Sequence, residues 1–270
     1  MADRLVHRCG RSMMHTNSVW ENEHFMTTDY DPIAGQYKRS KQQPWRTYIE
    51  AFSLMSLVGD LTGKSVLDMA CGEGFYSRLL RQKGAARVIG VDLSNAMIEL
   101  ARQQEAELNQ GIVYLVGDAR QLALLEKYDL VVSAYLLNYA RDRDEFGSMC
   151  AGIAHCLKPG GRFVTVNSSA SLDFSTAPSY RKYGFETSVV GKWQEGAPIK
   201  WTFFLEDRSF EIENYHLDVA AHEEALSSAG FGIVRWHAPL LSPEGKAAYG
   251  NDFWATFLDY PPIALIECTR

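Results

Sequence analysis

The sequence predicts an α/β fold of the doubly wound type, in which helices cover both faces of a mostly parallel sheet. Two observations lead to this prediction. Between residues 65 and 167, short apolar runs of strand length alternate with segments of helical pattern. The first of these runs ends in a turn of small residues, and a helical segment follows directly. Ligands of such folds bind beyond the carboxyl ends of the strands, so we expect a nucleotide-type site at this turn.

The turn after the first strand contains the most informative residues. Asp68 lies near the carboxyl end of the strand, and Ala70, Gly72 and Gly74 follow at alternate positions. Their lack of side-chain bulk lets the backbone approach a ligand closely. A dinucleotide fingerprint needs a further small residue at a fixed distance after the second glycine. The segment 75–77, Phe-Tyr-Ser, fits that fingerprint poorly.

The remaining elements follow in the order that a doubly wound sheet requires. Strands are predicted at Ser65–Met69, Arg87–Leu93, Ile112–Val116, Tyr128–Ala134, Arg162–Asn167, Phe231–His237 and Ile263–Cys268. Helices are predicted from Pro44 to about Leu61, at Phe75–Gln82 and Ser94–Leu108, after Asp142 or Asp144, and at Asp218–Ala229. Lys38–Gln43 is expected to be a loose polar connection and Pro239–Pro262 a loop.

Two acids stand at the ends of the next strands. Asp92 lies about 20 residues after the turn, where doubly wound folds place a carboxylate for ribose hydroxyls. Asp118 follows the third strand. The spacing Asp68-x-Ala70-x-Gly72-x-Gly74, together with these two acids, resembles the motifs of class I S-adenosylmethionine-dependent methyltransferases. The family pattern is written [DE]-x-G-x-G-x-G, and Ala70 replaces its first glycine.

This resemblance covers Ser65–Asn167 and implies a Rossmann-like fold with S-adenosylmethionine as cofactor. It implies seven strands, with the last one antiparallel and inserted between the fifth and the sixth. It also implies that Asp118 accepts a hydrogen bond from the adenine amino group. The segment from Tyr30 to Tyr37 is similar to the segment that covers the cofactor in this family. The implied cofactor residues are Tyr30, Tyr37, Asp68, Ala70, Gly72, Gly74, Asp92, Leu93, Met97, Asp118, Ala119 and Ala134.

The acceptor side is expected in two places. One is the segment Ala134–Tyr139 at the end of the fourth strand; the other is an insertion over residues 170–217. Within the insertion, Lys200–Leu205 and Ser209–Leu217 are predicted to form a hairpin. The resemblance to the methyltransferase family implies that this insertion roofs the substrate site. Aromatic residues here serve equally well as packing for the roof itself. The candidate substrate residues are Tyr135, Asn138, Tyr139, Trp193 and Tyr215.

A general base is needed only if the acceptor must lose a proton. His216, on the predicted roof strand, is the first candidate because histidine titrates near neutrality. His222 and Tyr215 are alternatives, and a packing role for His216 is as good an interpretation. An already nucleophilic nitrogen needs no base. No histidine or acidic cluster has metal-ligand spacing, so metal independence is expected.

A second resemblance covers most of Asp29–Thr269. The pattern Trp236-x-x-Pro239-Leu240-Leu241 followed by Phe253-Trp254, with Tyr183-Gly184 and Asn138-Tyr139, is similar to toxoflavin-pathway methyltransferases, which act on small heterocycles. It implies a compact heteroaromatic or similar acceptor.

Composition limits the partners. The net charge of −6 and the lack of a basic block disfavour nucleic acid, and no apolar run is long enough for a membrane span. Five cysteines without a C-x-x-C pair favour reduced thiols and a cytoplasmic location. Residues 1–25 are expected to be a poorly ordered or upstream extension, and residues 26–270 one methyltransferase domain, monomeric or homodimeric.

The function predicted from these observations is methyl transfer from S-adenosylmethionine to a nitrogen, oxygen or carbon atom of a small metabolite, in secondary metabolism. A nucleotide-dependent oxidoreductase and a catalytically inactive S-adenosylmethionine-binding protein are the alternatives.

Overall fold

A seven-stranded sheet forms the centre of the computed structural model, which describes residues 29–122 and 126–270. Its strands are β1 (Ser65–Met69), β2 (Arg87–Asp92), β3 (Val113–Val116), β4 (Tyr128–Ala134), β5 (Leu157–Ser168), β9 (Arg235–His237) and β10 (Ile263–Thr269). The order is β3-β2-β1-β4-β5-β10-β9, and β10 pairs antiparallel with both neighbours. This confirms the predicted fold class and the position of the last strand. The extension predicted for residues 1–25 lies outside the described residues.

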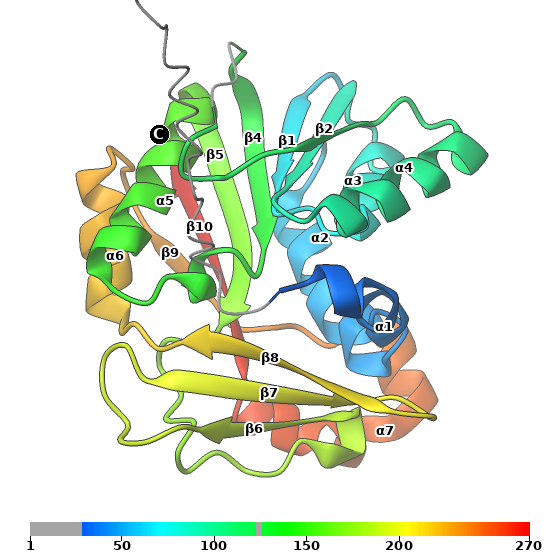
Figure 1. Ribbon diagram of the computed structural model, residues 1–270, viewed down its shortest axis with the longest axis vertical. Coiled ribbons are helices and arrows are strands. Elements are labelled where there is room, and N and C mark those ends of the chain that lie inside the picture. Colours follow the sequence, from blue (N-terminus) through cyan, green and yellow to red (C-terminus); the bar gives the residue numbers. More distant parts are fainter. Residues whose placement is uncertain (1–28, 123–125) are drawn as a thin grey trace, which may run out of the picture.

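Helices pack on the sheet as the strand–helix alternation requires (Figure 1). Helices α3 (Phe75–Gln82) and α4 (Asn95–Leu108) contact β1, β2 and β3, whereas α5 (Arg143–Cys156) contacts β4, β5 and α6 (Val219–Ser228). The N-caps of α4, α5 and α6 are side chains that accept a backbone N–H: Ser94, Asp142 and Asp218. Their short oxygen-bearing side chains explain why these helix starts were predictable from sequence.

The insertion forms a second, three-stranded antiparallel sheet. It comprises β6 (Phe185–Val189), β7 (Pro198–Phe204) and β8 (Ser209–Tyr215), and we call it the roof sheet. The predicted hairpin corresponds to β7 and β8, whereas β6 was not predicted. Figure 1 shows the roof sheet lying across the ends of β4 and β5. Alternate residues of β7 and β8 are buried, so one face of the roof sheet is part of the core.

Three local predictions were wrong. The predicted loop Pro239–Pro262 contains α7 (Pro243–Asp259), two helical segments that meet at a kink at Gly250. Ser242 caps its start, and Trp254 and Phe257 are fully buried beneath the roof sheet. The sixth strand is limited to β9, since Phe231 precedes rather than enters the ladder. The connection expected to be loose belongs to the core, because helix α1 (Ala34–Ser40) continues into it and Lys41 is buried.

The helix predicted from Pro44 is divided. Residues Arg46–Ala51 form a π-helical segment, and α2 (Phe52–Val58) continues it as an ordinary helix. Such π segments are rare and occur often at functional sites. The segment presents Arg46 and Glu50 to the interior, where both are buried.

Candidate functional site

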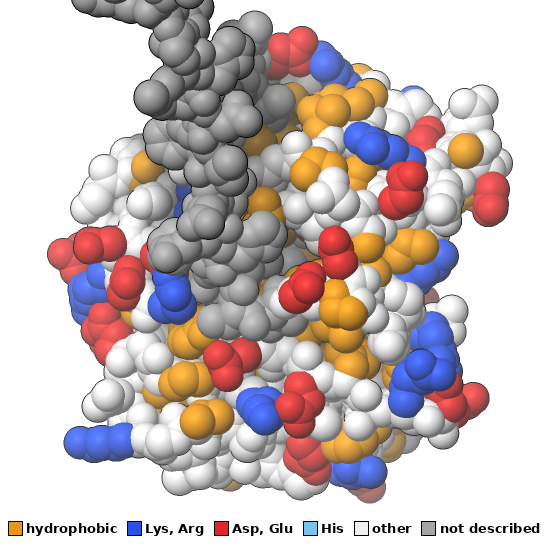
Figure 2. Space-filling view, viewed as in Figure 1, with side chains coloured by type: hydrophobic (Ala, Val, Ile, Leu, Met, Phe, Trp, Pro, Cys, Tyr) orange, Lys and Arg blue, Asp and Glu red, His pale blue; other side chains and the backbone are white. Residues whose placement is uncertain are grey.

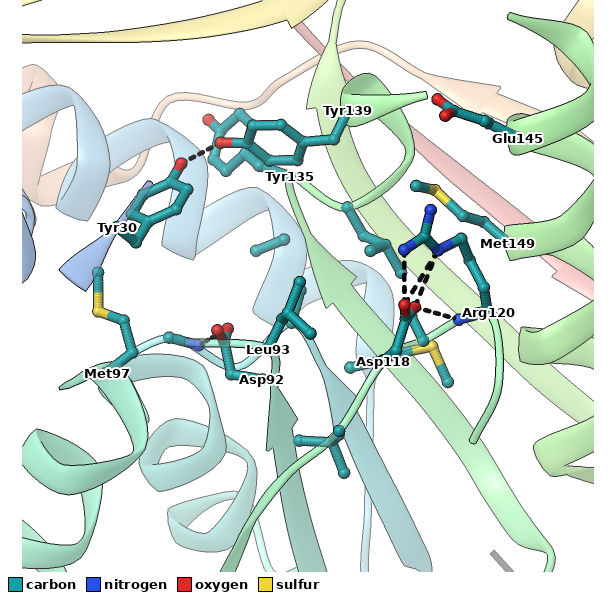
Figure 3. Close-up of a pocket in the computed structure, with 18 of the residues that line it drawn as sticks. Tyr30, Asp92, Leu93, Met97, Asp118, Arg120, Tyr135, Tyr139, Glu145 and Met149 are labelled. Carbon is teal, nitrogen blue, oxygen red and sulfur yellow. Dashed lines mark hydrogen bonds and ion pairs between the residues drawn. The ribbon is translucent and has the colours of Figure 1, made fainter. Parts of the chain in front are cut away.

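A cavity lies at the carboxyl ends of β1, β2 and β4. We call it the main cavity; Figure 3 shows it from within. It is lined by Tyr30, Tyr37, Met69, Ala70, Gly72, Val91, Asp92, Leu93, Met97, Gly117, Asp118, Ala119, Arg120, Ala134, Tyr135, Leu136, Tyr139, Glu145 and Met149. Ten of the twelve predicted cofactor residues are among them; Asp68 and Gly74 are not.

The turn after β1 is held in left-handed backbone geometry. Ala70, Gly72 and Gly74 have φ angles of 61°, 54° and 85°. Glycine accepts such angles without steric cost, whereas Ala70 does not. Gly74 is needed for a second reason: a Cβ there would lie 2.4 Å from the Tyr114 hydroxyl oxygen. Gly74 therefore shapes the turn from behind rather than contacting the cavity.

Asp92 is anchored by the same turn. One carboxylate oxygen accepts the backbone N–H of Gly72 at 2.7 Å, and the other accepts that of Ser94 at 2.9 Å. Burial raises the pKa of Asp92, although these two N–H groups oppose the shift. Each oxygen retains acceptor capacity, because an ionised carboxylate accepts about four hydrogen bonds. The carboxylate is thus oriented to accept two ligand hydroxyls.

Asp118 faces the main cavity from the end of β3, as Figure 3 shows. Arg120 binds it through the guanidinium, with a shortest N–O distance of 2.6 Å, and through its backbone N–H at 2.9 Å. Burial alone would raise the pKa of Asp118, but these hydrogen bonds lower it. Arg120 was not identified as a site residue from the sequence. Its position two residues after Asp118 was the one indication that it could pair with that carboxylate.

Asp68 lies behind the turn. It is buried, and one of its oxygens accepts the Ser77 hydroxyl at 2.5 Å. Its other oxygen has no hydrogen-bond partner among the described residues. Burial raises the pKa of Asp68 to about 7, against the effect of Ser77. Its position supports the turn and the start of α3, which differs from the direct cofactor contact expected.

Four tyrosines close the inner end of the main cavity. The hydroxyls of Tyr30 and Tyr139 point toward one another and are hydrogen-bonded (Figure 3). Tyr37 lies edge-on to Tyr30, with ring centroids 5.3 Å apart. Tyr135 follows β4 with a φ of 65°, and its N–H donates to the Val166 carbonyl at 2.8 Å. Burial raises the pKa of Tyr135 and Tyr139, so both keep their protons.

A buried charged cluster lies directly behind these tyrosines, and sequence reasoning missed it. Glu50, with 0% exposure, accepts the hydroxyls of Tyr76 and Tyr135. Its carboxylate also pairs with Arg46 at 2.8 Å and with Lys41 at 3.4 Å. Burial would raise the pKa of Glu50, but these two cations lower it below its ordinary value. In the sequence, Arg46 and Glu50 are a charged i, i+4 pair on a predicted amphipathic helix, and such a pair is ordinarily expected on the solvent-exposed face.

A second, smaller hollow lies under the roof sheet, and we call it the inner chamber. It is lined by Tyr37, Trp45, Arg46, Tyr135, Trp201, Phe203, Ile212 and Asn214. Tyr37 and Tyr135 line both hollows, so the two are neighbours across a shared tyrosine wall.

Of the predicted substrate residues, Tyr135 and Tyr139 line the main cavity. Asn138 is buried beside them, outside the lining, and its side-chain nitrogen and oxygen have no partner among the described residues. Trp193 and Tyr215 line neither hollow. Tyr215 bonds to Glu213 at 2.8 Å.

The predicted base His216 is also placed away from both hollows. Its ring stacks on Trp193 with centroids 4.0 Å apart, and burial lowers its pKa. The alternative His222 is buried against Phe146; burial lowers its pKa to about 4, and its Nδ1 contacts the Asp218 carbonyl at 2.8 Å. Neither histidine is among the residues that line the two hollows. His216 directly follows β8, beyond the buried alternate residues Phe210, Ile212 and Asn214 of that strand.

Two further observations limit the site chemistry. Among residues 29–122 and 126–270, no three His, Cys, Asp or Glu side chains are grouped to hold a metal ion. In the same part of the chain, every helix is too short or too polar to cross a bilayer.

The fold and the site first define a class of protein. A parallel sheet with a glycine-rich turn after its first strand, and carboxylates after its second and third, is the arrangement of nucleotide-binding α/β proteins. Comparison with known proteins makes the assignment specific. Residues 66–161 match the family described as a methyltransferase domain. The chain belongs to the class I S-adenosylmethionine-dependent methyltransferases, with S-adenosylmethionine as cofactor.

Individual relatives agree with this assignment. Demethylmenaquinone methyltransferase of Lactococcus lactis subsp. lactis (strain IL1403) is 30% identical over 178 residues, which cover 64% of this chain and 66% of the relative. N-demethylindolmycin N-methyltransferase of Streptomyces griseus is 29% identical over 174 residues, covering 63% of this chain and 70% of that protein. The chain thus matches about two thirds of the length of these relatives.

A solved structure supports the fold over a longer stretch. An S-adenosylmethionine-dependent methyltransferase from Clostridium acetobutylicum ATCC 824 superposes with a TM-score of 0.65 and 18% identity. The superposition covers 89% of this chain and 98% of the other. At this identity the similarity concerns the fold alone.

The residues of the main cavity fit the cofactor. Asp92 presents two oriented acceptor oxygens, the property needed for a ribose diol. The turn from Ala70 to Gly74 presents backbone rather than side chains, and Met97, Leu93 and Ala119 add apolar walls for an adenine ring. The tyrosine end lies beyond the turn, where the amino-acid part of the cofactor would extend.

Proposed function

We propose that this chain transfers the methyl group of S-adenosylmethionine to a small, ring-shaped metabolite that binds at the tyrosine wall between the two hollows. The observation that carries the proposal is the arrangement of the two hollows. The inner chamber shares Tyr37 and Tyr135 with the main cavity, and the roof sheet closes its other side.

The named relatives support this substrate class. One is named for a demethylmenaquinone and another for N-demethylindolmycin, both small molecules with rings. A relative from rice is named as a probable protein arginine N-methyltransferase, so the family also contains enzymes named for protein substrates. On the face shown in Figure 2, acidic and basic side chains alternate in small groups. Such a surface lacks the single-sign field that steers a highly charged polymer.

The cofactor, when bound, supplies a methyl group on a sulfonium; the acceptor atom bonds to that carbon as the carbon–sulfur bond breaks and its electrons pass to sulfur. The protein's part is positioning, which is worth about 7–11 kcal/mol in well-oriented systems. Asp92 and the turn fix the cofactor end, and the tyrosine wall fixes the approach of the acceptor. Because Tyr135 and Tyr139 hold their protons, they orient groups by donating hydrogen bonds.

No histidine lines either hollow among the described residues. The proposal therefore uses an acceptor atom that is nucleophilic without a protein base, such as a ring nitrogen or an anionic oxygen or carbon. The family match removes the support for the oxidoreductase alternative. We place the enzyme in the cytoplasm because Cys71, Cys150, Cys156 and Cys268 are all free and buried. Its use in secondary metabolism and its monomeric or homodimeric state belong to the same proposal.

The test uses the full chain in two stages. Calorimetric titration with S-adenosylhomocysteine measures cofactor binding, and the Asp92→Asn variant serves as a control with a weakened site. Labelled S-adenosylmethionine is then incubated with the protein and fractionated cell extract, and label is followed into the small-molecule fraction. We expect binding and small-molecule labelling together. Labelling of protein alone would contradict the substrate class, and binding without labelling would favour an inactive binding protein.

A further inference from the structure

The ion pair between Asp118 and Arg120 lies in the wall of the main cavity, and the proposed function gives it no role. Both side chains line the cavity and remain partly exposed, Asp118 at 26% and Arg120 at 24%. Ion pairs this exposed contribute little to the stability of a fold. Stability therefore gives little reason for the pair, whereas its position gives it access to the bound cofactor.

Arg120 takes up most of the hydrogen-bonding capacity of Asp118. Its backbone N–H donates to Oδ1 at 2.9 Å, its Nη2–H donates to Oδ2 at 2.6 Å, and its Nε–H is shared between the two oxygens at 3.0 and 3.1 Å. An ionised carboxylate accepts about four hydrogen bonds, so these three donors leave room for about one more. In Figure 3, Arg120 lies on the side of the carboxylate away from Asp92, and the other side is open to the cavity.

Helix α5 holds the segment that carries this pair. Glu145 and Gly152 are seven residues apart, so they lie on one face of α5. Glu145 lines the main cavity near Arg120 (Figure 3). A Cβ on Gly152 would lie 2.3 Å from the Ala119 carbonyl oxygen, so the lack of a side chain there lets α5 approach the backbone between Asp118 and Arg120. The pair is thus fixed by close packing and is not a mobile surface contact.

Arg120 also determines the charge state of Asp118. Burial would raise the pKa of this carboxyl group, but the hydrogen bonds and the charge of Arg120 lower it below its ordinary value. An ionised carboxylate only accepts hydrogen bonds, whereas a protonated carboxyl group also donates one. In its ionised state Asp118 therefore distinguishes a ring substituent that donates from one that accepts.

We infer that Arg120 is a positioning residue that makes Asp118 selective for an amino group on the purine base of the cofactor. The open acceptor site of Asp118 receives one amino N–H of adenine, whereas a base with a carbonyl at that position would bring oxygen against oxygen. The family resemblance implied the contact of Asp118 with adenine but assigned no role to Arg120. The inference concerns the cofactor end of the main cavity, so it does not depend on which acceptor is methylated.

The test compares two ligands that differ only in the base, S-adenosylhomocysteine and S-inosylhomocysteine. Calorimetric titration of the full chain gives both affinities. Their ratio cancels contributions from the shared ribose and amino-acid parts, including any titration of Asp92. We expect the unaltered protein to bind the adenine form at least about tenfold more tightly, with a ratio that stays constant from about pH 8 to about pH 5.

Three variants assign the effect. Arg120→Met removes the guanidinium and should lower the ratio about fivefold near neutral pH, with a further fall toward pH 5 as Asp118 takes up a proton. Arg120→Lys keeps the charge but not the planar fork, so its ratio should lie between those two values. Arg87→Met is the matched control, because Arg87 pairs with Glu126 outside both hollows, and its ratio should be that of the unaltered protein. Thermal melts check folding, and Arg120→Lys keeps the test decisive if Arg120→Met does not fold.

The ratio, and not the affinity for either ligand, decides the outcome. An equal loss of affinity for both ligands in Arg120→Met would show that Arg120 only supports the turn, and it would overturn the inference. Equal binding of the two ligands by the unaltered protein, or an unchanged ratio and pH profile in Arg120→Met, would overturn it as well. A preference for S-inosylhomocysteine would assign the base contact to Arg120 itself and would also contradict the inference. The labelling experiment tests the acceptor class separately, so the inference and the proposed function can fail independently.

Discussion

The two hollows that meet at Tyr37 and Tyr135 differ in their hydrogen-bonding chemistry. In the main cavity, the strand ends present the carboxylates of Asp92 and Asp118, which accept hydrogen bonds from hydroxyl and amino groups. In the inner chamber, the unpaired groups are N–H donors on Arg46 and Trp201. The two hollows therefore present opposite hydrogen-bonding groups on the two sides of the tyrosine wall.

The largest expected effect tests the cationic side of this comparison. Glu50→Ala leaves Arg46 and Lys41 buried without their carboxylate, so we expect unfolding stability to fall by about 3–5 kcal/mol. Urea denaturation measures it. Glu126→Ala is the control, since its pair with Arg87 is exposed and worth about 0–1 kcal/mol. Equal effects in the two variants would show that the Glu50 carboxylate does not stabilise the buried charges of Arg46 and Lys41.

The Asp92→Ala variant tests the hydrogen-bond-accepting carboxylates of the main cavity. The variant loses an oriented charged acceptor and the anchor of the Gly72 N–H. S-adenosylhomocysteine binding should weaken by about 1.5–3 kcal/mol, measured by calorimetry. Asp60→Ala removes a carboxylate that bonds to Thr62, outside the main cavity, and should leave binding unchanged. An unchanged affinity in Asp92→Ala would remove Asp92 from the site.

The pH dependence of stability tests the buried acid behind the turn. Asp68 has a folded-state pKa of about 7, above its unfolded value, so it binds a proton more tightly when folded. Its contribution to stability is therefore greatest at low pH and is lost as pH rises toward 7. Asp68→Asn carries no such penalty and should be more stable than the wild type by about 4 kcal/mol at pH 8. The two proteins should converge below about pH 4, the unfolded pKa of an aspartate; a constant difference across pH would contradict the assignment.

A smaller effect is expected at Ala70. Its φ of 61° is a left-handed angle that costs an alanine about 1–2 kcal/mol. Ala70→Gly removes that strain but increases the flexibility of the unfolded chain, so we expect a net gain of up to about 1 kcal/mol with cofactor binding retained. Ala86→Gly, at a position without a left-handed angle, should lower stability instead.

The smallest effect is expected at His216. Its ring stacks on Trp193 and lines neither hollow, so His216→Ala should leave turnover and cofactor affinity near wild-type values. A large fall in turnover with unchanged cofactor affinity would return His216 to the role of base and would extend the site beyond the two hollows.

The parts of the fold and site that could be predicted are those determined by residues close together in the sequence. The turn from Ala70 to Gly74, Asp92 and the cap residue Ser94 carry their roles in spacing and residue type, so the sheet and the main cavity could be predicted. The inner chamber could not, because Arg46 and Trp201 are separated by most of the chain and meet only when the roof sheet folds onto the π-helical turn. No local sequence pattern predicts that a particular lysine or arginine is buried.

The aromatic packing of the roof sheet has a consequence for how such an enzyme changes its specificity. Phe185 stacks on Trp201 at 5.2 Å, Tyr183 stacks on Trp254 of α7 at 5.6 Å, and the Tyr183 hydroxyl donates to the Phe253 carbonyl. The aromatic wall that we propose to contact the acceptor is thus also part of the hydrophobic core. Substitutions that enlarge this wall to admit a bulkier molecule remove buried side-chain atoms from the hydrophobic core. New acceptors should arise in this lineage only after compensating gains in stability elsewhere.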